Sequence, residues 1–395
     1  MSKIRIKDHS SPRESILKIF EEKYGSAPEN LVRAPGRVNL IGEHTDYNDG
    51  YVMPLAIDYA VWIAFSHITE PEVRLHSIDF NQSVVIPINH VLTKSDGWSE
   101  YLKGLISIFK KSKLEIFGWK GVMAGNVPIG AGLSSSAALS LAITRVFGTI
   151  SNWDWNPSQM ARICQLAENQ WIGVNCGIMD QMISALGQEE HLLLIDCRSL
   201  KTTPVPLPEG VRVVILDTGT RRGLVDSAYN ERRDQCESVA TFLGKKALRD
   251  VSYKQLKKAK VKIDPIQFKR ALHVVQENNR VLDCAESLRL GNLKHVGELM
   301  NSSHISLRDY FEVSCEALDL MVESALAVPG CYGARMTGAG FGGCAVALVE
   351  TKYTENFVKK VLKSYQNATG QKALLYVCKA AEGTSVYSKK EFAAQ

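Results

Sequence analysis

A glycine- and serine-rich loop places the tightest constraint on what this chain can fold into. Residues 125–138 read GNVPIGAGLSSSAA, and an apolar pattern with helical spacing follows through residue 147. Gly130 and Gly132 permit backbone conformations that other residues avoid, so the chain can turn sharply there and enter a helix. A helix N-terminus presents free N–H groups that bind anions. The loop predicts either a phosphate site or a plain helix start packed on a sheet.

The loop matches neither of the two common phosphate-binding patterns. No Gly-Lys-Ser/Thr follows it, and the third glycine of a dinucleotide fingerprint is missing. Its three consecutive serines could still serve phosphate oxygens or a hydrated Mg²⁺. A second glycine-rich stretch, TGAGFGGC at 337–344, does contain G-x-G-x-x-G, but a strand-like run follows it where a dinucleotide fold has a helix. That stretch predicts a tight turn or backbone close to a bound phosphate.

A third constellation lies between two apolar strand-like runs, at residues 33–54. Glu43, His44, Asp46 and Tyr47 crowd this loop. Carboxylates beside an imidazole can bond several hydroxyl groups at once, as a sugar requires. The Asn-Asp-Gly at 48–50 is also a plausible hairpin turn, which is the alternative. The density of carboxylate and imidazole before that turn favours a binding function.

The apolar patterning predicts a mixed α+β chain. Helical spacing covers residues 13–24, 100–109, 133–147, 157–172 and 178–186. Strand-like runs occupy 31–34, 38–41, 52–55, 60–65, 73–76, 84–88, 192–195 and 211–216. The Pro-rich passage TPVPLPEG at 203–210 is the predicted boundary between two domains, 1–205 and 206–395. Helices and strands (344–350, 373–377) continue in the second.

Composition excludes several classes of protein. The 395 residues carry 47 Lys+Arg against 42 Asp+Glu, and a net charge of +5 is too thin to indicate a nucleic-acid or membrane partner. Nine cysteines, an odd number without a C-x-x-C pair, predict reduced thiols. The first fifteen residues lack the apolar region of a signal peptide, and no apolar run approaches the roughly 20 residues of a membrane span. We expect a cytoplasmic monomer.

One stretch departs from this even charge distribution. Residues 245–270 hold ten Lys/Arg and two Asp. A polyanion patch is one interpretation, but only Tyr253 and Phe268 interleave aromatic rings for base stacking. A solvated helical surface is favoured, and we expect no nucleic-acid partner.

Taken together, the three constellations resemble those of a known family. GRVNLIGEHTDYNDG at 36–50 resembles the galactokinase signature, PIGAGLSSSAA at 128–138 the ATP loop of the GHMP small-molecule kinases, and TGAGFGGC their third motif. All three occur in the family's order across nearly the whole chain. The resemblance implies a two-domain fold: an N-terminal domain related to the second domain of ribosomal protein S5 and a C-terminal ferredoxin-like α+β domain, with the active site between them.

The resemblance also implies roles for matching residues. Asp180, in CGIMDQ, falls on the catalytic Asp, and Arg37 on its partner. The positions implied for the sugar are Glu43, His44, Thr45, Asp46, Gly177 and Tyr229. Those implied for the nucleotide are Ser77, Gly130, Ala131, Gly132, Leu133, Ser134, Ser135 and Ser136, with Ser136 and Glu168 as Mg²⁺ ligands. From the residues alone, Asp180 is a charge in a first helical turn and Glu168 a solvated carboxylate.

The activity implied is the Mg²⁺-dependent transfer of phosphate from ATP to the anomeric C1 hydroxyl of galactose. A kinase for N-acetylgalactosamine, arabinose or galacturonate is the alternative within the family. A sugar sensor without turnover is the alternative outside catalysis, against which the intact serine run, Asp180 and Glu168 argue.

Overall fold

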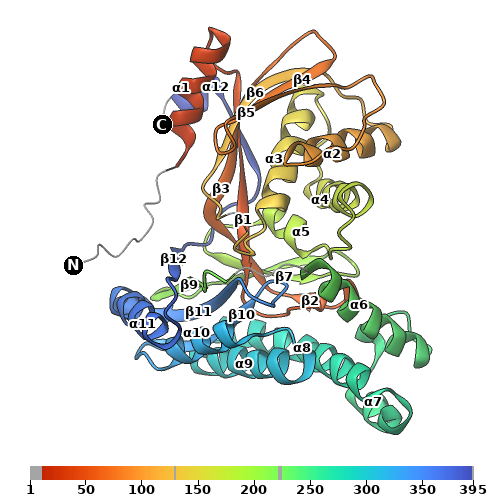
Figure 1. Cartoon of the computed structure of the whole chain (residues 1–395), viewed down its shortest axis with the longest axis vertical. Helices are drawn as coiled ribbons and strands as arrows, with labels where there is room; N and C mark the ends of the chain where they lie inside the picture. The colour runs from red at the N-terminus through yellow and green to blue at the C-terminus, as the bar shows by residue number, and fades with distance from the viewer. Residues whose placement is uncertain (1–10, 129, 221–224, 394–395) are drawn as a thin grey trace.

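The chain forms two stacked parts, as Figure 1 shows for the computed structural model, which describes residues 11–128, 130–220 and 225–393. A six-stranded sheet of order β13-β1-β3-β6-β4-β5 forms the upper part, antiparallel except for β4 with β6. Its strands are β1 (Asn30–Asn39), β3 (Pro54–His67), β4 (Glu72–Ser77), β5 (Gln82–Pro87), β6 (Trp119–Gly125) and β13 (Ser385–Ser388).

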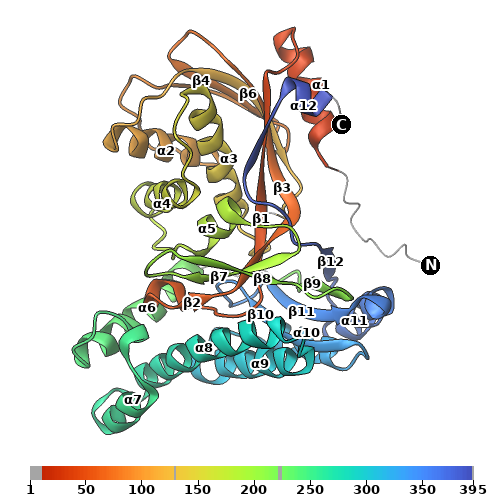
Figure 2. The same cartoon turned by 180° about the vertical axis from the view of Figure 1, so that it is seen from behind.

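Helices cover both faces of this sheet. On one face lie α2 (Ser99–Lys111), α3 (Ser135–Ile150), α4 (Pro157–Ala167) and α5 (Met179–Leu186), and on the other α1 (Arg13–Tyr24) and α12 (Lys389–Ala393) (Figures 1 and 2). Helix α2 illustrates why helices pack on the sheet. It carries an apolar stripe at helical spacing, and all of the stripe is buried: Leu102, Leu105, Ile106 and Phe109. Burial of such a stripe stabilises each helix more than its own propensity does.

The lower part contains a four-stranded antiparallel sheet of order β10-β11-β9-β12. Its strands are β9 (Val211–Asp217), β10 (Cys331–Thr337), β11 (Cys344–Glu350) and β12 (Leu374–Cys378). Helices α8 (Pro265–Arg289), α9 (Leu293–Ser306) and α10 (Glu316–Leu326) come between β9 and β10, and α11 (Thr354–Thr369) between β11 and β12. This is the predicted ferredoxin-like arrangement of split βαβ units.

A small sheet of order β2-β7-β8 lies between the two parts. It consists of β2 (Tyr51–Val52), β7 (His191–Asp196) and β8 (Thr202–Pro206). The Pro-rich passage thus begins as a strand that pairs with β7 alone, an edge position that tolerates proline. The predicted domain boundary between residues 205 and 206 stays a prediction. Strand β13, from the C-terminal end of the chain, pairs with β1 in the upper sheet.

Several predicted elements differ in their bounds or were missed. The runs at 31–34 and 38–41 form one strand, β1, whose register shifts between Pro35 and Arg37. The helix expected over 157–172 is α4 followed by a π-helical turn, η2 (Glu168–Ile172). Strand β6 was missed because its sequence, WKGVMAG, does not alternate between apolar and polar residues.

The remaining expectations concern cysteines and membrane spans. All nine cysteines are free, and seven of them are buried. Within the described ranges, no helix combines the length and apolar character needed to span a bilayer.

Candidate functional site

A cavity of about 190 Å³ lies where the two parts meet. Eight of the predicted site residues line it: Arg37, Glu43, His44, Asp46, Glu168, Gly177, Asp180 and Tyr229. They come from β1, the loop after it, η2, the segment that leads into α5 and the start of that helix, and helix α6 (Val225–Phe242). The fold therefore gathers side chains that lie nearly 200 positions apart in the sequence.

Arg37 and Asp180 form a bidentate ion pair at the cavity wall. Nε and Nη2 of Arg37 donate to the two Asp180 carboxylate oxygens, each at 2.7 Å, and Nη1 donates to the Gly132 carbonyl at 2.6 Å. Arg37 is only 5% exposed, and Asp180 is the second residue of α5. Charge-assisted bidentate pairs are strong and fix orientation, so the guanidinium holds both the carboxylate and the glycine-rich loop.

The glycine-rich loop turns into α3 as the sequence predicted. Gly132 has a φ of 73° and Ser134 a φ of 58°, both in the left-handed region, and α3 begins at Ser135 rather than Leu133. The Ser134 hydroxyl contacts the Asp180 carboxylate. The loop also approaches β1 closely, because a Cβ at Gly36 would lie 2.9 Å from the Leu133 carbonyl oxygen. Glycine at position 36 therefore lets the loop reach Arg37.

Glu43 is already bonded by the protein. Its carboxylate accepts from the Thr337 hydroxyl at 2.9 Å and the Gly338 N–H at 2.5 Å, and it contacts the Asn39 amide. The fully buried Arg335 lies 3.4 Å away and also donates to the carbonyls of Asn39 and Leu40. Glu43 thus ties the loop after β1 to the second glycine-rich stretch, a structural role that the sequence did not reveal.

His44 is a neutral imidazole in an aromatic cluster. Its Nε2 donates to the Ala339 carbonyl at 3.2 Å, so Nδ1 accepts from the Tyr47 hydroxyl at 2.8 Å. Burial lowers the pKa of His44 to about 3. The rings of Tyr47, Tyr229 and Phe311 lie within 6 Å of the imidazole, measured between ring centroids. This cluster offers an apolar face with hydroxyl groups at its rim.

Asp46 lies beside Gly177 in the lining of the cavity. A Cβ at Gly177 would overlap the Asp46 carboxylate, so only glycine fits there. Burial raises the pKa of Asp46 to about 6, and the negative charge of Asp180 adds to the shift. The Tyr47 N–H donates to one Asp46 oxygen at 2.9 Å. The backbone N–H of Met179 also hydrogen-bonds this carboxylate, which lines the cavity.

Glu168, which lines the cavity, is hydrogen-bonded to Ser136 of the serine run. The Ser136 hydroxyl bonds the Glu168 carboxylate, and Gln181 Nε2 donates to it at 2.8 Å. Burial, with the charge of Asp180, raises the pKa of Glu168. No basic side chain of the described residues forms an ion pair with Glu168. A buried carboxylate beside a hydroxyl, without a countercharge, suits a divalent cation that takes its other ligands from elsewhere.

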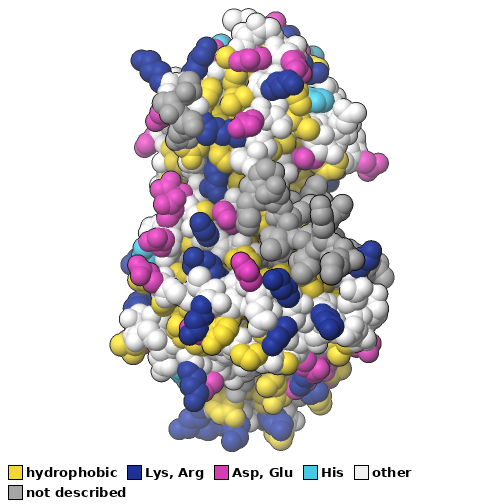
Figure 3. Space-filling model, turned by 90° about the vertical axis from the view of Figure 1, so that its left-hand side faces the viewer, with side chains coloured by type: hydrophobic (Ala, Val, Ile, Leu, Met, Phe, Trp, Pro, Cys, Tyr) yellow, Lys and Arg dark blue, Asp and Glu magenta, His cyan; other side chains and the backbone are white. Residues whose placement is uncertain are grey.

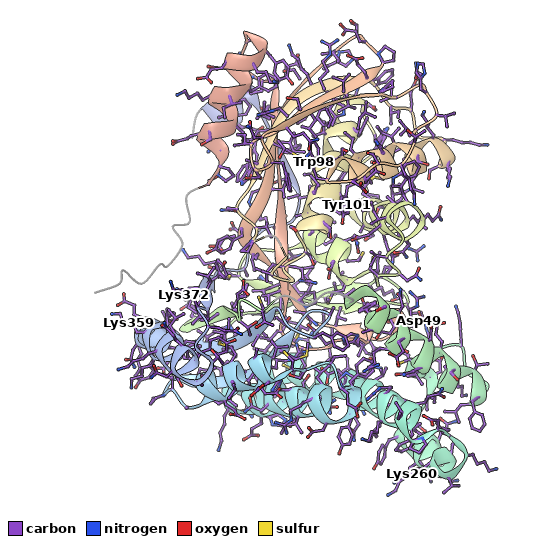
Figure 4. All side chains as sticks on the ribbon, viewed as in Figure 1. Asp49, Trp98, Tyr101, Lys260, Lys359 and Lys372 are labelled. Carbon is purple, nitrogen blue, oxygen red and sulfur yellow. The ribbon has the colours of Figure 1, made fainter. Side chains whose placement is uncertain are left out.

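A second cavity, of about 280 Å³, opens on the other side of the serine run. Ser135 and Ser136 line it together with Phe80, Trp98 and Tyr101. Figure 4 shows Trp98 and Tyr101 near the start of α2. The rings of Phe80 and Trp98 are stacked, 6.4 Å apart at an interplanar angle of 19°. Sequence reasoning missed these aromatics as ligand contacts: Phe80 and Trp98 fall outside the predicted elements, and Tyr101 lies in the helix predicted over 100–109.

Other predicted residues line neither cavity. The Thr45 hydroxyl donates to the carbonyls of Gly42 and Tyr51 within its own loop. Ser77 is buried, and its hydroxyl accepts from the Phe80 N–H at 3.4 Å, at the turn that carries that ring to the second cavity. The side chains of Ala131 and Leu133 are buried, so these residues can contact a ligand only through their backbone groups. Their assigned roles stay predictions, as does that of Gly130, which precedes them.

Family models match residues 18–67 (galactokinase galactose-binding signature), 100–188 (GHMP kinases N terminal domain) and 284–368 (GHMP kinases C terminal). The chain is 43% identical to a galactokinase of Roseiflexus sp. over 92% of its length and 94% of that protein. It is 43% identical to one of Haemophilus influenzae over 95% of this chain and 100% of that protein.

Two solved structures extend the comparison. Lactococcus lactis galactokinase complexed with galactose matches with a TM-score of 0.91 and 35% identity, covering 95% of this chain and all of that one. Methanococcus jannaschii mevalonate kinase matches with a TM-score of 0.65 at 20% identity, covering 91% of this chain and all of that one, a likeness of fold alone.

Proposed function

The chain belongs to the galactokinase family of the GHMP kinases, and from that premise we propose that it phosphorylates galactose at the C1 hydroxyl with ATP. The observation that carries the proposal is the Arg37–Asp180 pair, which faces a cavity built from the galactokinase signature. Galactose would occupy this cavity, against Asp46, His44 and Tyr229. The products are α-galactose 1-phosphate and ADP.

We assign the second cavity to the nucleotide. Its stacked aromatic rings suit the flat apolar face of adenine. The serine run lies between the two cavities, so phosphates held by its backbone N–H groups and hydroxyls would point toward Asp180. This arrangement would bring the γ-phosphorus near the sugar hydroxyl, which is the main requirement of phosphoryl transfer.

Asp180 would take the proton of the C1 hydroxyl as the oxygen bonds to phosphorus. Its carboxylate is oriented by two Arg37 hydrogen bonds and by the N-terminal turn of α5. The bond between the γ-phosphorus and the bridging oxygen breaks, and ADP leaves. The Arg37 guanidinium also offsets negative charge close to the transferring group.

A divalent cation is part of the proposal. No cluster of three or more His, Cys, Asp or Glu suited to metal ligation occurs in the described part of the chain. Mg²⁺ usually keeps several waters and binds through one or two carboxylates and the substrate phosphates, which fits the pair Glu168 and Ser136. When bound, the cation would neutralise phosphate charge, while these two residues would hold it.

Glu168→Gln tests this assignment. The amide keeps the size of the side chain but loses its charge, so we expect the Mg²⁺ concentration for half-maximal rate to rise severalfold, with partial recovery at high Mg²⁺. Initial rates in a Mg²⁺ titration measure this. Glu355→Gln, an exposed change on α11, is the matched control. Unchanged activity of the Glu168 variant at low Mg²⁺ would remove Glu168 from the metal site.

Asp46 predicts a pH dependence of sugar affinity. With a pKa of about 6, it accepts hydrogen bonds as a carboxylate above pH 6 and becomes protonated below. We expect the KM for galactose to rise about tenfold between pH 8 and pH 5, while the KM for ATP changes little. Asp46→Asn should give a flat profile with a high KM.

Protonation of Asp46 does not itself destabilise the fold. The folded-state pKa of Asp46 lies above the ordinary value of 3.8, so its protonation favours the folded state as the pH falls through 6 toward 4. The contribution of Asp46 to stability thus improves while sugar binding worsens. A wild-type KM for galactose that does not vary with pH would show that Asp46 does not bind the sugar as a carboxylate.

The proposed function itself is tested by coupled ADP release. Galactose, N-acetylgalactosamine, arabinose and galacturonate are compared with ATP and Mg²⁺, and we expect the highest kcat/KM for galactose. Galactose binding without ADP release would favour a sensor, and preference for another sugar would replace the substrate.

We further propose that the protein acts as a monomer in the cytoplasm. Nine free cysteines fit a reducing compartment. Light scattering on a sizing column tests the monomer.

A further inference from the structure

A helical arm projects from the lower end of the molecule (Figure 1). Beyond α6 it contains η3 (Leu248–Asp250), α7 (Tyr253–Ala259) and η4 (Lys260–Lys262), and then the chain enters α8. This arm holds the basic stretch at 245–270. None of these residues lines the two cavities described above, so the proposed reaction leaves the stretch without a role.

The basic side chains of the arm fall into two groups. Arg249, Lys269 and Arg270 form ion pairs, Arg249 with Asp196 and the other two with Glu312. The second group has no ion pair to any described residue: Lys245, Lys246, Lys254, Lys257, Lys258, Lys260 and Lys262. The two aspartates of the stretch do little to offset the positive charge of these lysines, because Asp250 pairs with Arg198 and Asp264 caps α8.

An apolar groove of about 380 Å³ runs between the end of α6 and α7. Its lining combines apolar and basic side chains: Phe242, Leu243, Lys245, Val251, Gln255, Lys258, Ala259 and Lys262. Phe242 is 55% exposed and Val261, between two lysines, 90% exposed. Figure 3 shows the side of the molecule away from the arm, where Lys and Arg side chains also lie at the lower end; Figure 4 labels Lys260 on the arm itself. Contiguous exposed apolar surface rimmed by polar residues is typical of interaction sites.

We propose that this lysine-rimmed groove binds an acidic amphipathic helix of a partner protein. A concave apolar groove receives side chains at i, i+3 and i+4 of a helix, and acidic residues on the flanks of that helix meet the unpaired lysines. The two aromatic rings of the stretch do not offer a platform for bases, because Lys257 lies over Tyr253 and Lys260 over Phe268. A hollow, rather than a protruding apolar edge, favours a helix over a bilayer surface.

The test measures binding of a defined peptide to the full chain. The probe is a fluorescein-labelled helix of about 18 residues, with Leu at i, i+3, i+4 and i+7, Glu on the flanks of this apolar stripe and Ala elsewhere, at about 0.15 M salt. A scrambled peptide of the same composition is the first control. We expect binding of the helical peptide, seen as a rise in anisotropy, and much weaker binding of the scrambled one.

Matched double variants distinguish binding in the groove from non-specific attraction between the acidic peptide and the protein's lysines. Lys258→Glu with Lys262→Glu should weaken binding about tenfold or more, whereas Lys359→Glu with Lys372→Glu, exposed lysines on the other side of the molecule (Figure 4), should change it less than about twofold. Phe242→Ser, at an exposed position, should also weaken binding. Kinase rates equal to those of the unaltered chain show that every variant is folded.

Four outcomes would overturn the proposal. They are no peptide binding, equal binding of the scrambled peptide, equal losses in both double variants, and no effect of Phe242→Ser. Vesicles containing phosphatidylserine form a parallel arm, in which groove-dependent vesicle binding without peptide binding would assign the surface to a membrane. Dimers that dissociate in the groove variant would assign it to a second copy of the chain. None of these results depends on which sugar the enzyme uses.

Discussion

Asp180→Asn is expected to lose between about a hundredfold and ten-thousandfold in kcat, the usual contribution of a positioned general base. Asparagine keeps the shape of the side chain and can still accept one hydrogen bond from Arg37. It cannot accept a proton from the C1 hydroxyl, and it leaves the guanidinium without its countercharge. Initial rates at saturating galactose and ATP measure the loss.

Binding and stability must be measured on the same preparations. We expect both substrates to bind with constants close to those of the unaltered chain, because Asp180 acts on the reacting proton. Asp234→Asn is the matched control, since Asp234 is an exposed residue of α6 that lines neither cavity. Retention of more than about a tenth of kcat in the Asp180 variant would contradict a catalytic base.

Arg37→Ala is the second large effect, about a hundredfold to a thousandfold in kcat. The change removes both bonds to Asp180 and the bond to the Gly132 carbonyl. Of the four carboxylates that line the cavity, Glu43 keeps its ion pair with Arg335, whereas Asp46, Glu168 and Asp180 then share the cavity without the guanidinium. Arg37→Lys keeps the charge but loses the planar fork, so we expect measurable activity that is well below that of arginine.

Thermal melts beside initial rates decide between two roles of Arg37. A charge clamp predicts that Arg37→Lys retains activity and that both variants melt near the temperature of the unaltered chain. A tether for the glycine-rich loop predicts that both variants lose stability and that activity falls in proportion to the folded fraction. Parallel losses of that kind would make Arg37 a structural residue.

The sequence by itself determined the elements that have a strong local pattern. Helix α1 has the predicted bounds because an apolar stripe and Gly25, in the left-handed region, define both its face and its end. The turn into α3 was predictable because Gly130 and Gly132 meet a local steric need. The partnership of Arg37 with Asp180 came from family resemblance, since no spacing within the chain indicates it.

The tertiary structure alone decided which distant groups meet. Arg335 lies 292 positions from Glu43, yet it is fully buried against that carboxylate and makes it part of the scaffold. Strand β6 exists because β3 and β4 flank it, not because WKGVMAG has a strand pattern. Trp98 and Ser136, which are 38 positions apart in the sequence, line the same second cavity. Short stretches of sequence determine backbone preferences. Burial, pKa values and cavities depend on contacts between segments that lie far apart in the sequence.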